Sequence, residues 1–225
     1  MSTIVITGAN RGIGLAMAQI CQQRGDTVYA LCRNSSAALK ALNVNVVEQV
    51  DVSTDSGIDN AVAALKGVNI HLLINNAGIL RDEQLNNFNQ STIVEQFNVN
   101  ALAPIALSHA LLNNLSSGSK VAFITSRMGS ITDNTSGGRY GYRMSKVALN
   151  IAAVSLARDL EADNVCVGIY HPGYVQTEMV NSNGVLANGD ISAEVAAQRL
   201  IALMDNLTIK ESGVFKHSNG ETLPW

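Results

Sequence analysis

Tyr142 and Lys146 are spaced so that both side chains can act on one substrate atom. They fall in a segment with a helical pattern, and residues four apart in a helix stand on the same face. A free phenol has a pKa near ~10, and an ammonium group close by favours the phenolate and lowers that pKa. The pair is therefore a candidate general acid and base for a substrate oxygen. The spacing is also compatible with a half-buried tyrosine beside a solvated lysine.

A glycine-rich turn near the N-terminus is the second candidate for chemistry. Gly8, Gly12 and Gly14 follow a short β-branched run and precede an apolar-periodic helix that ends near Gly25. Backbone N–H groups and the helix dipole attract anions at such a turn, and glycine lets the backbone approach a phosphate. The spacing differs from the general Gly-x-Gly-x-x-Gly fingerprint, and a nucleotide-triphosphate loop is excluded because no Gly-Lys-Ser/Thr follows. A glycine turn without a ligand is the alternative.

Strand and helix patterns alternate along the whole chain and would position these residues. Such alternation is typical of a doubly wound parallel sheet. We therefore expect an α/β fold of Rossmann type, with a mainly parallel seven-stranded sheet, helices on both faces and three layers. Without a linker or an internal repeat, residues 1–225 are expected to form a single domain. The expected strands are residues 3–7, 27–32, 44–50, 71–75, 121–125, 165–171 and 214–216, and the later helices are 58–65, 91–115 with a kink at Pro104, 140–162 and 192–206.

Composition excludes several classes of protein. Among the 225 residues, 47% are hydrophobic and only 15% are charged, which suits a globular fold with a large core rather than disorder. The net charge of −3 gives no basic surface for nucleic acid. Apolar runs are shorter than a membrane span, and no secretory leader pattern is visible, so we expect no membrane partner and a cytoplasmic protein.

Cysteines and histidines offer no second reactive centre. Three scattered cysteines argue against a disulfide framework, and none has metal-binding spacing, so no metal is expected. Neither His-Glu-x-x-His nor Gly-x-Ser-x-Gly is present, which argues against metallohydrolases and serine hydrolases. His171 precedes Pro172 and Gly173 near the expected pocket, and a structural role is the better interpretation.

Several short motifs stand in order along the chain: residues 7–14 (TGANRGIG), 75–78 (NNAG), Asn100 in 99–101, Ser126 in 125–129, 142–146 (YRMSK) and 172–177 (PGYVQT). Together they resemble the motifs of the short-chain dehydrogenase/reductase family. The resemblance covers almost the whole chain, and several motifs in register are far more specific than any one alone. Within the family, the C-factor/sniffer-like branch of carbonyl reductases is the most similar. The segments that resemble this branch are residues 140–146, 171–177 and 220–225 (GETLPW).

Ser126 is the residue expected to hold the substrate oxygen together with Tyr142. It follows the fifth strand, and ligands bind beyond the carboxyl ends of strands in open α/β sheets. Its hydroxyl can donate to a carbonyl oxygen that becomes an alkoxide. A loop serine that only makes a turn is the alternative, and Ser130 is a nearby competitor.

The resemblance implies further roles for Lys146 and Asn100. Lys146 would lower the pKa of Tyr142 and bind the nicotinamide ribose, and Asn100 would hold a water that links Lys146 to solvent. Asparagine is disfavoured within a helix, which makes Asn100 notable. Its neighbour Asn98 is the competing candidate, expected on a solvated face.

Charges near the glycine turn indicate which cofactor the chain takes. A carboxylate at the end of the second strand would bind the ribose hydroxyls of NAD, but Cys32 stands there, followed by Arg33. Arg33 and Arg11 together suit a 2′-phosphate, so NADP(H) is expected, although Arg33 as a solvated loop residue is the alternative. By resemblance, Asp51 and Val52 contact the adenine. The expected cofactor contacts are Gly8, Asn10, Arg11, Gly12, Ile13, Gly14, Arg33, Asp51, Val52, Asn76, Ala77, Gly78, Tyr142, Lys146, Pro172, Gly173, Val175 and Thr177.

The expected function is therefore an NADP(H)-dependent carbonyl reductase or alcohol dehydrogenase, with a small carbonyl or alcohol as substrate. An NADP-binding signalling protein with incidental turnover is the alternative, because the same branch includes a protein linked to cell–cell signalling. The expected pocket is lined by Ile79, Leu80, the 127–140 loop and the loop after Thr177, which match no known ligand. Family members often form homodimers through the two long helices, 91–115 and 140–162, although an apolar helix face also suits the protein's own core.

Overall fold

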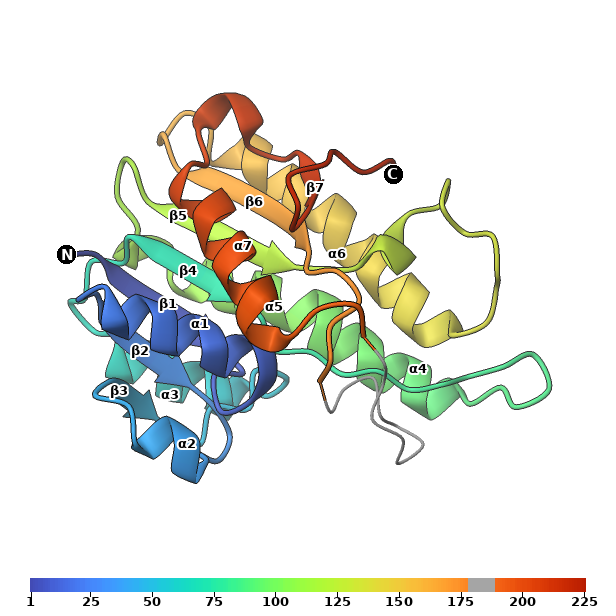
Figure 1. The fold of residues 1–225 in the computed structure, drawn as a ribbon, viewed down its shortest axis with the longest axis horizontal. Coiled ribbons are helices and arrows are strands. Elements are labelled where there is room, and N and C mark those ends of the chain that lie inside the picture. The colour runs from blue at the N-terminus through green and yellow to red at the C-terminus, as the bar shows by residue number, and fades with distance from the viewer. Residues whose placement is uncertain (178–188) are drawn as a thin grey trace.

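A single sheet forms the centre of the fold. The computed structural model describes residues 1–177 and 189–225, and its seven strands lie in the order β3-β2-β1-β4-β5-β6-β7 (Figure 1). Every pair of neighbouring strands runs parallel, so the prediction of a mainly parallel, doubly wound sheet is confirmed. Chain order reverses between β1 and β4, which is the position where such sheets bind ligands. The strands are β1 (Thr3–Thr7), β2 (Thr27–Leu31), β3 (Asn45–Val47), β4 (Leu72–Asn75), β5 (Lys120–Ile124), β6 (Cys166–His171) and β7 (Phe215–His217).

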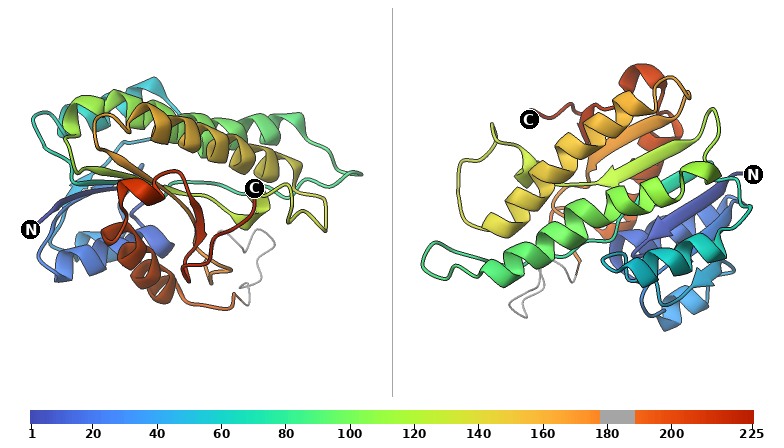
Figure 2. Two further views of the ribbon diagram at one scale, coloured as in Figure 1. Left: turned by 90° about the horizontal axis from the view of Figure 1, so that it is seen from above. Right: turned by 180° about the vertical axis from the view of Figure 1, so that it is seen from behind.

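Helices cover both faces of the sheet, which gives the three expected layers. Figure 2 shows α1 and α7 together on one face, and α3, α5 and α6 on the other. Side chains alternate along β1, so Ile4 and Ile6 pack under α1 and α7 while Val5 packs under the opposite layer. The helices are α1 (Gly12–Gln23), α2 (Ala37–Lys40), α3 (Asp55–Ala64), α4 (Gln90–Phe97), α5 (Ala103–Ala110), α6 (Tyr140–Asp159) and α7 (Ala193–Asp205), with short helical turns η1 (Asn98–Leu102), η2 (Leu112–Asn114), η3 (Arg127–Gly129) and η5 (Ile209–Glu211).

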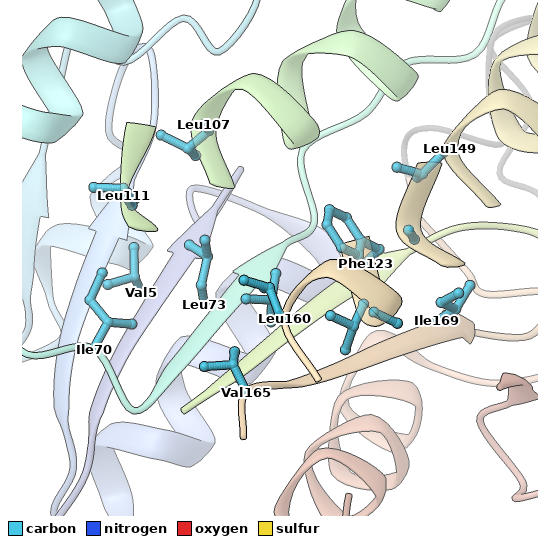
Figure 3. Close-up of a cluster of buried hydrophobic side chains, with 14 of the residues drawn as sticks. Val5, Ile70, Leu73, Leu107, Leu111, Phe123, Leu149, Leu160, Val165 and Ile169 are labelled. Atoms are coloured by element: carbon cyan, nitrogen blue, oxygen red, sulfur yellow. The ribbon is translucent and has the colours of Figure 1, made fainter. Parts of the chain in front are cut away.

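The core between the sheet and α6 fixes the helix that carries the candidate catalytic pair. Leu149 of α6 and Leu107 of α5 pack over Leu73 and Phe123 of the central strands, and all four are buried (Figure 3). Burying each such side chain stabilises the fold by roughly 1.5–3 kcal/mol. Tyr142 and Lys146 therefore sit on a helix that is anchored further along by apolar contacts.

The expected single helix over residues 91–115 is the largest difference between sequence and structure. The segment consists of α4, a π-helical turn (η1), α5 and the short turn η2. Within η1 the backbone hydrogen-bond spacing widens from four residues to five, because the Ala103 N–H donates to Asn98 O. Pro104 follows at the start of α5, where it has no N–H to continue an α-helical ladder. The predicted kink is thus a change of helix type just before the proline.

Other boundaries shift by a few residues. Helix α3 begins at Asp55 rather than residue 58, because the Thr54 side chain accepts from the Gly57 N–H and caps the helix three residues earlier. The final edge strand, β7, lies one residue later than expected. Residues 178–188, which include the loop expected after Thr177, lie outside the described residues. Among helices in the described ranges, none has the length and apolar character needed to cross a membrane.

Candidate active site

Helix α6 brings Tyr142, Lys146 and Asn150 together on its buried face. All three are buried, and the spacing of four residues places them one above another along the helix. The Lys146 Nζ donates to the carbonyl of Ile124, the last residue of β5, at 3.0 Å. The same ammonium lies 5.7 Å from the centroid of the Tyr142 ring. The pair therefore lies at the carboxyl edge of the sheet.

Burial controls how Tyr142 titrates. Burial raises the pKa of its phenol, and although a side-chain hydrogen bond with Ser126 and the charge of Arg139 lower that pKa, it stays above its ordinary value. The pKa of the phenol is therefore raised overall, and the expectation that Lys146 lowers it stays a prediction. Burial also lowers the pKa of Lys146, to about 8. Tyr142 is thus a neutral phenol at neutral pH, the form that can donate a proton.

Ser126 meets Tyr142 at the end of β5. Its Oγ accepts from the Met128 N–H at 3.1 Å and caps the turn η3, so the hydroxyl proton is free to point elsewhere. That hydroxyl is close enough to the Tyr142 phenol to lower its pKa. The competitor Ser130 is also buried, but its Oγ accepts from the Asp133 N–H at 3.1 Å and caps the next turn. Ser126 is therefore the serine that the fold brings to the tyrosine.

Asn150 is a positioning residue that the sequence interpretation missed. Its Oδ1 accepts from the Thr125 hydroxyl at 2.6 Å, and its Nδ2 donates to Gly129 O at 3.2 Å. These contacts fasten both sides of Ser126 to the helix that carries Tyr142. The signal was present, since Asn150 continues the four-residue spacing as a polar residue within a helix, where asparagine is disfavoured.

Asn100 lies within η1 and is buried, whereas the competing Asn98 is exposed. The Asn100 side chain both donates to and accepts from the backbone of Ile79, at 2.8 Å each, and also donates to the Ser145 hydroxyl at 3.0 Å. It therefore ties the loop after β4 to α6, one residue before Lys146. Its expected role in a proton relay stays a prediction.

The glycine turn lies at the switch point between β1 and β4. A Cβ on Gly14 would lie only 2.4 Å from Gly8 O, so the turn is too tight for a side chain there. The Asn76 Nδ2 donates to Thr7 O at 2.9 Å, and the N–H groups of Asn76 and Ala77 both donate to the Thr7 hydroxyl at 3.0 Å. Asn76 and Ala77 thus join the ends of the two strands. Helix α1 begins at Gly12 with no acidic residue in its first turn, which suits an anion.

Arg33 and Asp51 lie in the segments that follow β2 and β3. Partial burial opposes ionisation of Asp51, but hydrogen bonds from the Ser53 N–H and hydroxyl, with the charge of Arg33, hold its pKa below the ordinary value. Arg33 therefore lies near Asp51, at the end of β2, and is exposed, as is Arg11. Val52 packs partly against the core. Arg11 and Arg33 thus follow β1 and β2, which are neighbours in the sheet.

The segment after β6 returns to the glycine turn. A Cβ on Gly12 would lie 3.5 Å from Thr177 Cγ2, so these two expected cofactor contacts are neighbours. Val175 is buried and pairs with Ile191 as a bridge. The His171 ring lies 5.0 Å from the His217 ring, and burial lowers the pKa of His171 to about 3, which keeps it neutral and fits a structural role.

Comparison with known proteins agrees with this geometry. The family model for short chain dehydrogenases matches residues 2–185, well over half of the chain. The chain belongs to the short-chain dehydrogenase family. This dehydrogenase is 36% identical, over 227 aligned positions and 100% of both chains, to 1-hydroxy-2-glutathionyl-2-methyl-3-butene dehydrogenase of Rhodococcus sp. (strain AD45). It is also 36% identical over 159 positions to C-signal of Myxococcus xanthus, covering 69% of this chain and 93% of that protein.

A solved structure of a carbonyl reductase is similar to the dehydrogenase over the whole chain. The NADPH-bound carbonyl reductase from chicken fatty liver superposes with a TM-score of 0.89 at 29% identity, covering 100% of this chain and 99% of that chain. The resemblance to the C-factor/sniffer-like branch is therefore confirmed. The short-chain dehydrogenase is an oxidoreductase with carbonyl-reductase-like neighbours.

Proposed function

We propose that the protein is an NADP(H)-dependent carbonyl reductase or alcohol dehydrogenase in which Tyr142 is the general acid and base. The observation that carries the proposal is the closeness of the buried Ser126 and Tyr142 side chains, beside Lys146, at the carboxyl edge of the sheet. Two hydroxyl groups that meet there are suited to hold one substrate oxygen.

The bound cofactor supplies or accepts a hydride at the substrate carbon. Ser126 donates a hydrogen bond to the carbonyl oxygen and stabilises the negative charge that develops on it. Tyr142, neutral because burial raises its pKa, gives its proton to that oxygen during reduction. The Lys146 ammonium lies over the tyrosine ring and stabilises the phenolate that remains.

NADP(H) is proposed as the cofactor because the residues present fit its phosphates. The tight turn at Gly14 and the uncapped N-terminus of α1 suit the pyrophosphate. Arg11 and Arg33 suit the 2′-phosphate. Asp51 lies near Arg33, where it would contact the adenine. A carbonyl reductase similar over the whole chain is described as NADPH-bound, which supports the same choice here.

Purified protein should oxidise NADPH in the presence of carbonyl compounds, or reduce NADP with alcohols. The panel of test compounds should include a glutathione-bearing alcohol, because a relative that is 36% identical to this chain is named a dehydrogenase of such a compound. Tyr142→Phe should lower kcat by about 10² to 10⁴-fold, since it removes the proton donor, and should leave NADPH affinity nearly unchanged.

Tyr29→Phe is the matched control, because it makes the same chemical change on β2, at a core residue outside the site, and should leave kcat unchanged. A fully active Tyr142→Phe variant would remove Tyr142 from the mechanism. Absence of turnover by the unaltered protein with the whole panel would reject the enzyme function.

A signalling protein is the second candidate, and the similarity to C-signal of Myxococcus xanthus favours it. Tight NADPH binding without turnover would support this candidate over the first. The presence of Asn100, Ser126, Tyr142 and Lys146 in one buried arrangement favours the enzyme.

We also propose that the protein forms a homodimer through α4 and α6. These helices lie side by side on the outer face (Figure 2), and each exposes large apolar side chains. Phe97, Leu102, Met144 and Ile151 are all exposed, and a groove between the helices is lined partly by Phe97 and Met144. Exposed apolar side chains that gather on one face are typical of an interaction site.

A further inference from the structure

A buried carboxylate lies outside the residues that touch substrate or cofactor. Glu83 belongs to the loop between β4 and α4, and only 2% of it is exposed. A glutamate is almost never buried unless its charge is paired or hydrogen-bonded. The groups that hydrogen-bond to the carboxylate therefore indicate its structural role.

Three donors surround the Glu83 carboxylate. Its Oε1 accepts from the Thr92 hydroxyl and from the Gln96 Nε2, both at 2.6 Å, and its Oε2 accepts from the Gly141 N–H at 3.3 Å. Thr92 and Gln96 belong to α4, whereas Gly141 is the second residue of α6. One side chain thus joins the two helices.

The bond to Gly141 holds the first turn of α6, immediately before Tyr142. A carboxylate at a helix N-terminus satisfies a free N–H and interacts favourably with the helix dipole. The close approach needs a glycine, because a Cβ on Gly141 would lie 2.4 Å from the Gln96 Nε2. The Glu83 carbonyl also accepts from the Arg139 N–H at 2.7 Å, and Arg139 has a left-handed φ of 51°. Such a φ persists in a non-glycine residue only where its surroundings impose it.

A second set of hydrogen bonds holds the helix on the C-terminal side of Tyr142. The Ser145 hydroxyl donates to Tyr142 O at 2.8 Å and accepts from the Asn100 side chain at 3.0 Å. Tyr142 therefore lies between two polar attachments to the segment that runs from the β4 loop through η1. Removal of the first would free the start of α6 while leaving the second in place.

We propose that Glu83 is a positioning residue for Tyr142, and that its carboxylate fixes the first turn of α6 so that the phenol meets Ser126 and the substrate oxygen. The proposal rests on the carbonyl reductase function proposed above. It assigns Glu83 no contact with substrate or cofactor.

Glutamine cannot replace Glu83 in this role. The Gln96 amide is fixed, because its Oε1 accepts from the Arg81 N–H at 2.8 Å. A glutamine side chain at position 83 that offered its oxygen to Gln96 would turn its NH2 toward the Gly141 N–H, and the reverse orientation would oppose the Gln96 NH2. Either orientation places two donors face to face, so Glu83→Gln removes the attachment with little change in size.

The test compares Glu83→Gln with the unaltered protein, using a carbonyl substrate from the panel above. We expect kcat to fall about 10- to 100-fold, as misplacement of a catalytic group does, while NADPH affinity by fluorescence stays unchanged. The solvent deuterium isotope effect on kcat should rise, because proton transfer from a displaced Tyr142 becomes slower. Glu95→Gln is the matched control, since Glu95 pairs with Arg81 on the surface and its change should affect none of these quantities.

Wild-type kcat in Glu83→Gln, or a loss of kcat with an unchanged isotope effect, would overturn the proposal while the enzyme function stands. A lack of turnover in the unaltered protein would instead overturn the enzyme function itself. If Glu83→Gln does not fold, Thr92→Val tests the proposal instead. It keeps the Glu83 carboxylate and removes one of its donors, the Thr92 hydroxyl. A smaller fall in kcat with a raised isotope effect supports the proposal, and unchanged values reject it.

Discussion

At the scale of single residues, burial determines the chemistry of Tyr142 and Lys146. Burial disfavours the charged form of each, so the pKa of the tyrosine rises and the pKa of the lysine falls to about 8. A neutral tyrosine and a lysine whose pKa is lowered are suited to pass a proton toward a substrate oxygen. The fold makes this possible at a cost in stability, since a charged lysine is held in the core.

Lys146→Met should therefore stabilise the protein at pH 7, by up to about 3 kcal/mol, while lowering kcat. The figure is the free-energy equivalent of a pKa that burial lowers from 10.5 to about 8. Between these two values the folded protein binds fewer protons than the unfolded chain, so the unfolding free energy of the unaltered protein rises with pH. The difference between the two proteins in urea unfolding should shrink from pH 8 to pH 10.5.

Lys66→Met is the control for this experiment, because Lys66 is exposed and its replacement should change stability little at any pH. A Lys146→Met variant less stable than the unaltered protein at pH 7 would contradict the expected cost of burial.

Arg33→Ala should separate the two nicotinamide cofactors. Loss of a charged hydrogen bond to the 2′-phosphate should raise the Kd for NADPH by about tenfold or more, with the Kd for NADH unchanged. Lys40→Ala removes an exposed cation from the nearby helix α2 and should leave both constants unchanged. Fluorescence titration measures both, and NADH bound more tightly than NADPH by the unaltered protein would reject the choice of cofactor.

At the scale of elements, polar side chains lock the loop after β5 and the π-helical turn onto α6. Asn150 holds Thr125 and Gly129, and Asn100 holds Ile79 and Ser145. Helix periodicity in the sequence places Tyr142, Lys146 and Asn150 on one face. It does not show what that face meets, because each partner lies at least 21 residues away in the chain.

Asn150→Ala should lower both stability and kcat. It leaves the buried Thr125 hydroxyl and Gly129 carbonyl without this partner, at a cost of about 1–3 kcal/mol, and loosens the turn that carries Ser126. Urea unfolding and steady-state kinetics measure the two effects. Asn113→Ala, at an exposed position, should show neither, and a stable Asn150→Ala variant with full kcat would show that Ser126 is held by other contacts.

At the scale of the whole molecule, one sheet unites strands from residue 3 to residue 217, which supports the proposal that residues 1–225 form a single domain. The outer faces of α4 and α6 remain apolar after this sheet is covered. Some apolar side chains of these helices are therefore not buried in the core. The sequence pattern alone did not show whether the core would bury them.

Ile151→Arg should therefore convert a dimer into a monomer. Ile151 is 63% exposed on α6, and a buried, unpaired arginine at an apolar interface is strongly unfavourable. Sedimentation or light scattering measures the mass, and Ile131→Arg is the control, because Ile131 is equally apolar and exposed but lies in the loop before α6. A monomeric unaltered protein at micromolar concentration would reject this interface.

The sequence by itself determined the order of the elements, the parallel sheet, the family and the face shared by Tyr142 and Lys146. These depend on local periodicity, on glycine turns and on short motifs, which are written in neighbouring residues. Tertiary structure decided the direction of the Tyr142 pKa, the capping of α6 by Glu83 and the fastening of Ser126 by Asn150. Each depends on burial or on partners distant in the chain, and these exist only after the helices pack on the sheet.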